Sequence, residues 1–274
     1  MSLERREERT IGGCPCAVFG DTGPVVVLVS AFPFSGALFT EVVRRLTQRA
    51  RVVVPELHHA PDSGLFSELV ERLIAVVDGC EDPQAVVAHG LAVPLLLQAA
   101  ERLPTPQLVV ANGPVTRLDA ITATLAAVCR APGGKTTASN TILRPGAFVR
   151  WLASSAGLRR AVVNPYVMDV ETVEELALPL LTEAQTRQKI AVFLSSIRAT
   201  SDEFHPGARQ IAAIWGDADV LFPCSEAEFF ASARYHGMHV AVPGGRFLFP
   251  KERPWELADA LISILKLAPI DPVP

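Results

Sequence analysis

The chain has 274 residues, of which 49% are hydrophobic and 20% are charged, so it can bury a substantial core and is not expected to be disordered. This length suits one large domain or a domain with a sizeable insertion. The formal net charge of −4 argues against nucleic-acid binding, which depends on a basic face.

The N-terminus and the cysteines indicate a cytoplasmic protein. The first ten residues, MSLERREERT, are polar and charged and lack the apolar core of a signal peptide. Apolar runs such as PVVVLVSAFPF are far shorter than the ~20 residues of a membrane helix, so no membrane segment is expected. The cysteines follow no zinc or redox spacing, and we expect reduced thiols that pack as small apolar groups and bind no metal: Cys14, Cys16, Cys80, Cys129 and Cys224.

The first elements in chain order are an entry hairpin over 7–17, with its turn at Gly12-Gly13, and then alternating strands and helices. Apolar runs rich in β-branched residues predict strands, and segments of helical periodicity predict helices between them. The expected strands are 24–32, 51–57, 84–90 and 107–113, and the expected helices are 39–50, 67–80 and 91–104. This alternation favours a parallel sheet with right-handed crossovers.

The alternation stops at Pro114 and resumes near Ala208. The intervening sequence has polar loops and helical stretches such as ETVEELALPLLTEAQTRQKIAVFLSSI, but no convincing strand. After it, the sequence predicts strands over 208–220 and 238–244 and helices over 225–235 and 254–267. We therefore expect an α/β core of residues 1–113 and 206–274. Residues 114–205 would form a helical insertion over the carboxyl ends of the strands, where such sheets bind ligands.

The layout resembles that of the α/β-hydrolase superfamily over nearly the whole chain, and four local stretches support this resemblance. VVVLVSAFPFSG is similar to the strand and oxyanion loop of that family, and AHGLA is similar to its nucleophile elbow, usually Gly-x-Ser-x-Gly. IWGDADVLFP resembles the loop with the triad acid, and VPGGRFLFPKERPWELADALISIL resembles the terminal Pro-Gly-Gly-His-Phe segment and last helix. The resemblance implies the α/β-hydrolase fold: a mostly parallel central sheet flanked by helices, with the insertion as a helical cap.

The same stretches depart from the chemistry of the family. Only Asp219 keeps the identity of its triad position, because Gly90 stands where the serine is expected and Arg246 where the histidine is expected. Ser30-Ala31 replaces the His-Gly that is common in the oxyanion loop. Glycine has no attacking group, and an arginine side chain keeps its proton at neutral pH. Since losing the serine or the histidine of such a triad costs on the order of 10⁶ in turnover, ordinary ester or amide hydrolysis is not expected.

Other side chains are candidates to replace the missing groups. Ser30, at a strand end, could pair with His58 or His59, but the simpler expectation is that Ser30 bonds loop backbone and that both histidines are exposed. Cys224 lies at a predicted helix start, where a thiolate could be stabilised, yet a packed small residue is expected. Cys80 is expected at the opposite end of the sheet.

His89 could reach the space left by the missing serine, although a partly buried histidine is usually held structurally. Gly90 suits the strained backbone of the elbow. Asp219 and Arg246 are expected to form an ion pair, because a partly buried unpaired charge is costly. Alternatively, Arg246 binds an anionic ligand. Asn112 could bond a ligand or cap the turn into the insertion. The expected ligand pocket consists of Ser30, Phe32, His89, Gly90, Leu91, Asn112, Asp219 and Arg246.

These features favour a catalytically degenerate hydrolase-fold protein that binds a small apolar molecule or a protein partner. One alternative is a non-hydrolytic enzyme of lyase, isomerase or cyclase type, for example in natural-product biosynthesis. A second is a hydrolase with a relocated nucleophile. The stretch GGKTT at 133–137 lacks the first glycine and the preceding strand of a phosphate-binding loop, so neither nucleotide binding nor a cofactor is expected.

Overall fold

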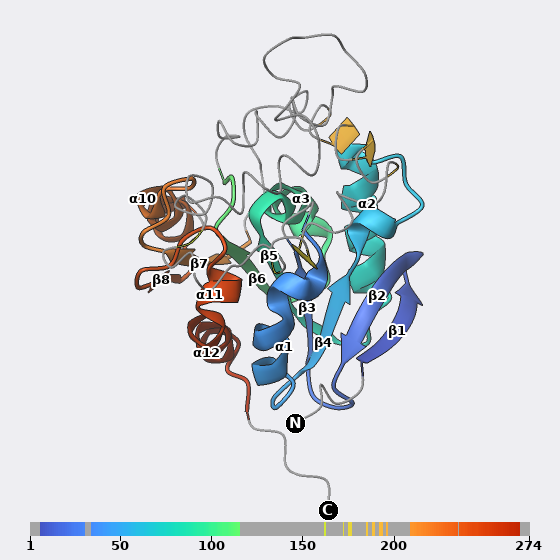
Figure 1. The fold of residues 1–274 in the computed structure, drawn as a ribbon, viewed down its shortest axis with the longest axis horizontal. Helices are drawn as coiled ribbons and strands as arrows, with labels where there is room; N and C mark the ends of the chain where they lie inside the picture. The colour runs from blue at the N-terminus through green and yellow to red at the C-terminus, as the bar shows by residue number, and fades with distance from the viewer. Residues whose placement is uncertain are drawn as a thin grey trace, which may run out of the picture.

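The structure is a computed structural model. It describes residues 6–30, 34–115, 209–234 and 236–268, together with residues 162, 172, 175, 176, 185, 188, 189, 192, 193 and 196. The described residues contain one eight-stranded sheet with the strand order β1-β2-β4-β3-β5-β6-β7-β8 (Figure 1). The strands are β1 (Arg6–Ile11), β2 (Cys14–Phe19), β3 (Val25–Val29), β4 (Arg51–Pro55), β5 (Pro83–His89), β6 (Gln107–Ala111), β7 (Ile211–Gly216) and β8 (His239–Val242).

Strand pairing confirms the expected class of fold. β1 and β2 form the predicted antiparallel hairpin, and β2 also pairs with β4 in the antiparallel sense. All the other neighbouring pairs, from β4 and β3 across to β7 and β8, are parallel. The sheet is therefore mostly parallel, as the alternation of strands and helices predicts.

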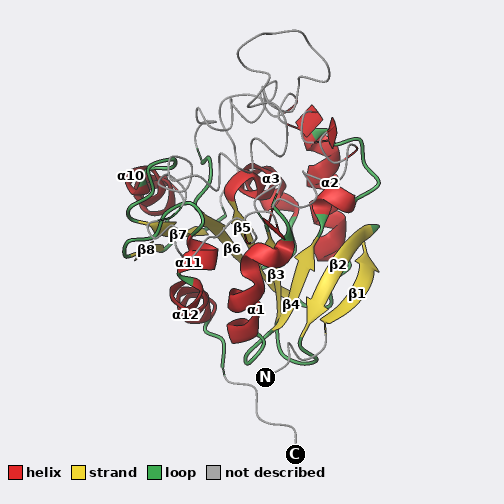
Figure 2. Cartoon of the chain, viewed as in Figure 1, coloured by secondary structure: helices red, strands yellow, loops and turns green. Residues whose placement is uncertain are grey.

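Helices flank the sheet on both faces (Figure 2). The α-helices are α1 (Thr40–Leu46), α2 (Phe66–Asp78), α3 (Val93–Ala99), α10 (Cys224–Glu228), α11 (Phe249–Glu252) and α12 (Pro254–Leu265). The shorter turns are η1 (Gly36–Phe39), η2 (Leu57–His59), η3 (Gly90–Ala92), η4 (Ala100–Arg102) and the π-helical η6 (Phe229–Arg234). Within the described ranges, no helix has the length and apolar character needed to cross a membrane.

Three helices differ from their predicted form. The helix expected over 39–50 ends as an α-helix at Leu46. The helix expected over 91–104 is α-helical only from Val93, where Pro94 occupies the first turn; a proline fits there because its missing N–H would have no intrahelical acceptor. The helix expected over 225–235 changes to a π-helix at Phe229. The short α11 was not predicted, because four residues carry too little periodicity.

Alternating residues of the strands fill two separate cores. In β3, Val25, Val27 and Val29 pack on the face covered by α2, α3 and α10, whereas Val26 and Leu28 pack on the face covered by α1, α11 and α12. All five side chains are at most 1% exposed. Full burial of such a side chain contributes roughly 1.5–3 kcal/mol, so a central strand without polar residues is strongly favoured in this position.

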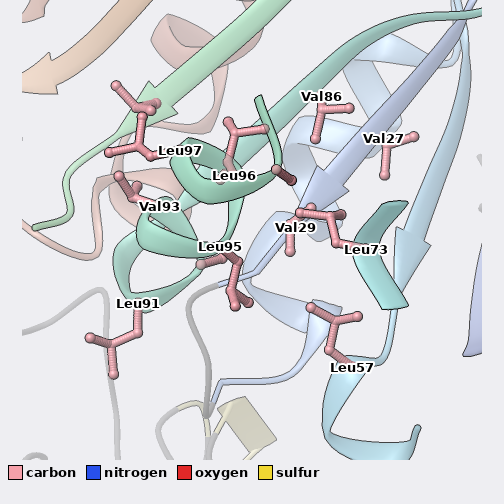
Figure 3. Packing of buried hydrophobic residues seen from close by; sticks show 14 of the residues in the cluster. Val27, Val29, Leu57, Leu73, Val86, Leu91, Val93, Leu95, Leu96 and Leu97 are labelled. Carbon is pink, nitrogen blue, oxygen red and sulfur yellow. The ribbon is translucent and has the colours of Figure 1, made fainter. Parts of the chain in front are cut away.

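Helix α3 is apolar on almost all sides and is held tightly behind the sheet. Leu95, Leu96 and Leu97 are fully buried, and Figure 3 shows them among Val86 of β5 and Val29 of β3. A helix that is apolar all round is stable only when it is enclosed, here by the sheet and by α2. The turn between β5 and α3 is therefore fixed by the pairing of β5 in the sheet and by the packing of α3 behind it.

Part of the predicted insertion contacts the core. Val162, Leu176 and Phe193 are fully buried in the same cluster as the α2 and α3 side chains. The rings of Phe193 and Phe66 lie 6.1 Å apart, and the Phe66 N–H donates to Ser196 Oγ at 2.9 Å. The boundaries 114–205 and the cap role stay predictions. The GGKTT stretch and Cys129 lie outside the described residues.

Candidate functional site

The carboxyl ends of β5, β6, β7 and β8 lie next to one another, because these strands are parallel and adjacent in the sheet (Figure 1). This edge is where open α/β sheets bind ligands. The loops that follow the four strands carry Gly90, Asn112, Asp219 and Arg246. The structure thus brings together four of the predicted pocket residues, and backbone and side-chain hydrogen bonds tie their loops to one another.

Gly90 forms a sharp turn between β5 and η3. Its backbone φ is +58°, a region in which a residue with a Cβ atom costs about 1–2 kcal/mol. Its N–H donates to the Asn112 carbonyl at 3.0 Å, and a Cβ atom on Gly113 would collide with the Gly90 carbonyl. The chain therefore keeps the tight geometry expected of an elbow, without a side chain at its apex.

Asn112 clamps the ends of β6 and β7. Its side chain is fully buried, the amide group donates to Asp219 Oδ2, and Oδ1 accepts the Gly216 N–H at 2.8 Å. Its φ of +29° is rare for a residue other than glycine, and asparagine is among the few that tolerate positive φ. Because both ends of the amide are engaged by the protein, Asn112 acts as a structural clamp.

Asp219 is held by neutral donors. Its side chain is buried, and Oδ1 accepts the N–H groups of Leu221 at 2.7 Å and Phe222 at 3.3 Å, while Oδ2 accepts the Asn112 amide. Hydrogen bonds from several N–H groups stabilise an ionised carboxylate and fix its direction. The carboxylate is therefore buried and fixed in its direction.

Arg246 lies beside the Asp219 loop but does not form the expected ion pair. The Ala218 N–H donates to the Gly245 carbonyl at 3.1 Å, and the Gly244 N–H donates to Asp217 Oδ1 at 2.7 Å, so the two loops are joined. Among the described residues, no ion pair or hydrogen bond links Arg246 to Asp219, which accepts hydrogen bonds from Asn112, Leu221 and Phe222. The prediction of an ion pair between Asp219 and Arg246 was therefore wrong.

His89 is a packing residue in an aromatic environment. Its ring is fully buried between Phe39, Phe247 and Phe249, with centroid separations of 6.3, 5.1 and 6.1 Å. Nε2 lies 2.7 Å from the Phe247 carbonyl, so Nε2 carries the proton and donates. Burial lowers the pKa of His89 to about 4, and Nδ1 has no hydrogen-bond partner. The imidazole is therefore neutral and committed to backbone.

The other predicted pocket residues contribute less. The Ser30 hydroxyl donates to the Phe34 carbonyl at 2.9 Å, which matches the expectation that it bonds loop backbone. Leu91 is buried in the core beside α3 (Figure 3). Phe32 lies outside the described residues, as does the side chain of His58. His59 is exposed, as expected.

The cysteines near the sheet ends are neutral thiols. Cys224 is the first residue of α10, and its Sγ lies 3.6 Å from His239 Nε2. Burial, followed by the carboxylates of Asp217, Glu228 and Asp219, raises the pKa of Cys224, so a stabilised thiolate is not favoured there. Cys80 precedes β5, at the opposite end of the sheet, and burial raises its pKa to about 11.

Phe247 was not predicted as a site residue, although its carbonyl accepts the His89 hydrogen bond. The centroid of its ring lies 6.4 Å from that of Phe34 and 5.7 Å from that of Phe222. The place of Phe247 directly after the expected histidine position was the available signal. In the described part of the chain, no three His, Cys, Asp or Glu side chains are arranged to hold a metal ion.

Solved structures resemble this chain over nearly its whole length. An α/β-hydrolase-fold protein from Burkholderia ambifaria has a TM-score of 0.71 at 19% identity, covering 96% of this chain and 98% of that chain. A 2-hydroxy-6-oxo-6-phenylhexa-2,4-dienoate hydrolase from Rhodococcus sp. strain RHA1 has a TM-score of 0.75 at 15% identity, covering 96% and 99%. An esterase from Thermogutta terrifontis has a TM-score of 0.68 at 17% identity, covering 96% and 98%.

No protein-family model and no curated protein matches the sequence. The structural likeness and the mostly parallel eight-stranded sheet nevertheless establish the class: the chain has the α/β-hydrolase fold.

Proposed function

We propose that this protein uses the α/β-hydrolase scaffold to bind a small, largely apolar molecule without hydrolysing it. The observation that carries the proposal is the chemistry at the elbow. Gly90 has no side chain, and the adjacent His89 imidazole is fully buried, which lowers its pKa to about 4 and makes it a weak base. Acyl transfer needs a nucleophile and a neighbouring base. The described residues at this edge of the sheet supply neither.

The magnitude of the loss supports binding over catalysis. Loss of the nucleophile or the base of such a triad reduces turnover by on the order of 10⁶, which is roughly 8 kcal/mol of transition-state stabilisation. Gly90 and Arg246 together remove both groups, so the remaining scaffold can orient a ligand but lacks the groups that cleave it.

The described side chains also disfavour a relocated nucleophile. The Ser30 hydroxyl donates to a carbonyl, and a serine becomes nucleophilic only when a base accepts its proton. Cys224 has the imidazole of His239 beside it, but burial raises the pKa of Cys224 and lowers the pKa of His239. A neutral thiol next to a neutral imidazole is the less reactive form of this pair.

Aromatic rings support a small, largely apolar ligand over a protein partner. The rings of Phe34, Phe222 and Phe247 form one cluster at the carboxyl ends of the strands. Phe247 belongs to this cluster and is only partly buried. Sites for small molecules typically combine such apolar surface with a few polar groups.

The proposal is tested by hydrolysis of 4-nitrophenyl acetate and 4-nitrophenyl butyrate. We expect the purified protein to match the uncatalysed rate, and the Ser30→Ala variant to behave identically. A catalysed rate that Ser30→Ala abolishes would establish a relocated nucleophile. A catalysed rate that survives in Ser30→Ala would also contradict the proposal and would point to another group.

A further inference from the structure

The guanidinium of Arg246 has no counter-ion among the residues that the structure describes. Its Nε is buried without a hydrogen-bond partner, and no hydrogen bond or ion pair of its side chain is found in the described part of the chain. Two other arginines have hydrogen-bond partners within the protein. Arg72 makes two hydrogen bonds to Asp62, at 2.8 and 2.9 Å, and Arg209 donates to three backbone carbonyls. A buried N–H without an acceptor is unfavourable, so an acceptor from outside the protein is favoured.

The neighbouring carboxylate does not fill this role. Asp219 lies in the loop that contacts the Arg246 loop, yet its oxygen atoms accept hydrogen bonds from Asn112, Leu221 and Phe222. These donors fix the carboxylate in its own loop. The N–H groups of the Arg246 guanidinium are therefore available to another anion.

The sequence neighbour of Arg246 suggests the rest of the ligand. The next residue, Phe247, extends the aromatic cluster of Phe34 and Phe222. A guanidinium matches a planar carboxylate with two parallel hydrogen bonds, and an aromatic surface matches an apolar body. Because the whole protein carries a formal charge of −4, attraction for an anion must come from this local cation.

We infer that Arg246 binds the carboxylate of a small organic acid whose apolar body lies against Phe247. This inference rests on the proposed ligand-binding function and names the chemical class of the ligand. It also gives a reason for arginine at the position where the fold family has a histidine: the residue that would act as a base in a hydrolase holds an acid here.

The test compares the binding of 4-phenylbutyrate with that of its neutral amide, 4-phenylbutanamide, by isothermal titration calorimetry at low salt. We expect the wild-type protein to bind the acid about 10- to 100-fold more tightly than the amide, the range typical of a charge-assisted hydrogen bond. Arg246→Gln should abolish the preference, and Arg246→Lys should keep part of it because a lysine ammonium lacks the planar fork.

The matched control is Arg44→Gln, which removes an exposed arginine of α1 that is paired with Glu41. It should keep the full preference for the acid, and far-UV circular dichroism verifies that each variant is folded. Equal affinity for acid and amide in the wild type, absence of acid binding at millimolar concentration, or a preference that persists in folded Arg246→Gln overturns the inference. Ester hydrolysis by the protein would overturn the proposed function while leaving the preference for the acid intact, so the two failures are distinguishable.

Discussion

At the scale of single residues, His89 and Gly90 decide what the elbow can do. His89 is enclosed by phenylalanine rings and held through Nε2, and Gly90 occupies a backbone conformation that penalises other residues. Both features serve structure, and neither leaves a group that can exchange a proton with a ligand at neutral pH. Two predictions follow from this pair.

The stability of the protein should decrease on acidification because of His89. The folded protein has a pKa of about 4 at this residue, and the unfolded chain has the ordinary value near 6.5, so the unfolded chain takes up the proton first as the pH falls. The contribution of His89 to stability is complete above pH 6.5 and is lost progressively towards pH 4. Between pH 7 and pH 5, the free energy of unfolding should fall by about 2 kcal/mol from this residue.

Urea denaturation at the two pH values measures this effect. The variant His89→Gln keeps an N–H donor for the Phe247 carbonyl but does not titrate, so its loss between pH 7 and pH 5 should be smaller by about 2 kcal/mol. His236→Asn, at an exposed position where φ is +52°, should retain the wild-type dependence. An unchanged dependence in His89→Gln would show that His89 is not held neutral.

Restoring a serine at the elbow should not restore hydrolysis. Gly90→Ser places a hydroxyl beside a fully buried histidine whose pKa is lowered to about 4, so no effective base activates it. We expect no turnover of 4-nitrophenyl butyrate and a loss of about 1 kcal/mol in stability from the positive φ. The double variant Gly90→Ser/Arg246→His, which adds an imidazole next to the Asp219 loop, should gain measurable turnover. Measurable turnover by Gly90→Ser alone would reveal a different base, and no turnover by the double variant would show that an imidazole at position 246 does not supply one.

At the scale of elements, the site depends on how neighbouring strand ends are joined. Asn112 bridges β6 to the loop after β7, and the loop after β8 packs directly on that loop. A Cβ atom on Gly216 would collide with the carbonyl of Gly245, so the two loops can lie this close only with glycine at position 216. These contacts place Gly90, Asp219 and Arg246 at fixed positions.

Removing the Asn112 side chain should release this joint. Asn112→Gly suits the positive φ but removes the donor to Asp219 Oδ2 and the acceptor of the Gly216 N–H, so we expect a loss of about 2–4 kcal/mol in urea denaturation. The control Asp82→Gly removes an exposed side chain at a similar φ of +49° and should change stability by less than about 1 kcal/mol. If Asn112→Gly and Asp82→Gly are equally stable, the hydrogen bonds of the Asn112 side chain contribute nothing to the stability of the protein.

The sequence predicted the strands well because each is a short apolar run that must be buried on both faces, as in β3 and β5. Helix ends were less predictable, since the end of α1 at Leu46 and the π-helical turn at Phe229 depend on tertiary packing. The resemblance also brought Gly90 and Arg246 to one site. The resemblance did not reveal that Asn112 and local N–H groups donate to Asp219. The spacing of residues in the sequence does not determine which donors lie within hydrogen-bonding distance of a carboxylate.

At the scale of the whole molecule, buried residues of the segment between β6 and β7 share a core with the sheet. Phe193 and Leu176 are fully buried in the cluster that contains α2 and α3. We therefore expect one cooperative unfolding transition, with coincident midpoints by far-UV circular dichroism and by tryptophan fluorescence. Phe193→Ala should lower the stability of this single transition by about 3–5 kcal/mol. Two separate transitions would contradict a shared core.

The central claim is that the scaffold binds a ligand but does not form an acyl-enzyme. The most direct measurement is intact-mass spectrometry after incubation with a fluorophosphonate, which reacts covalently with activated serine nucleophiles, with an active serine esterase as the positive control. The account predicts no added mass on the wild-type protein under conditions that label the esterase completely. Stoichiometric addition at a single serine would contradict it.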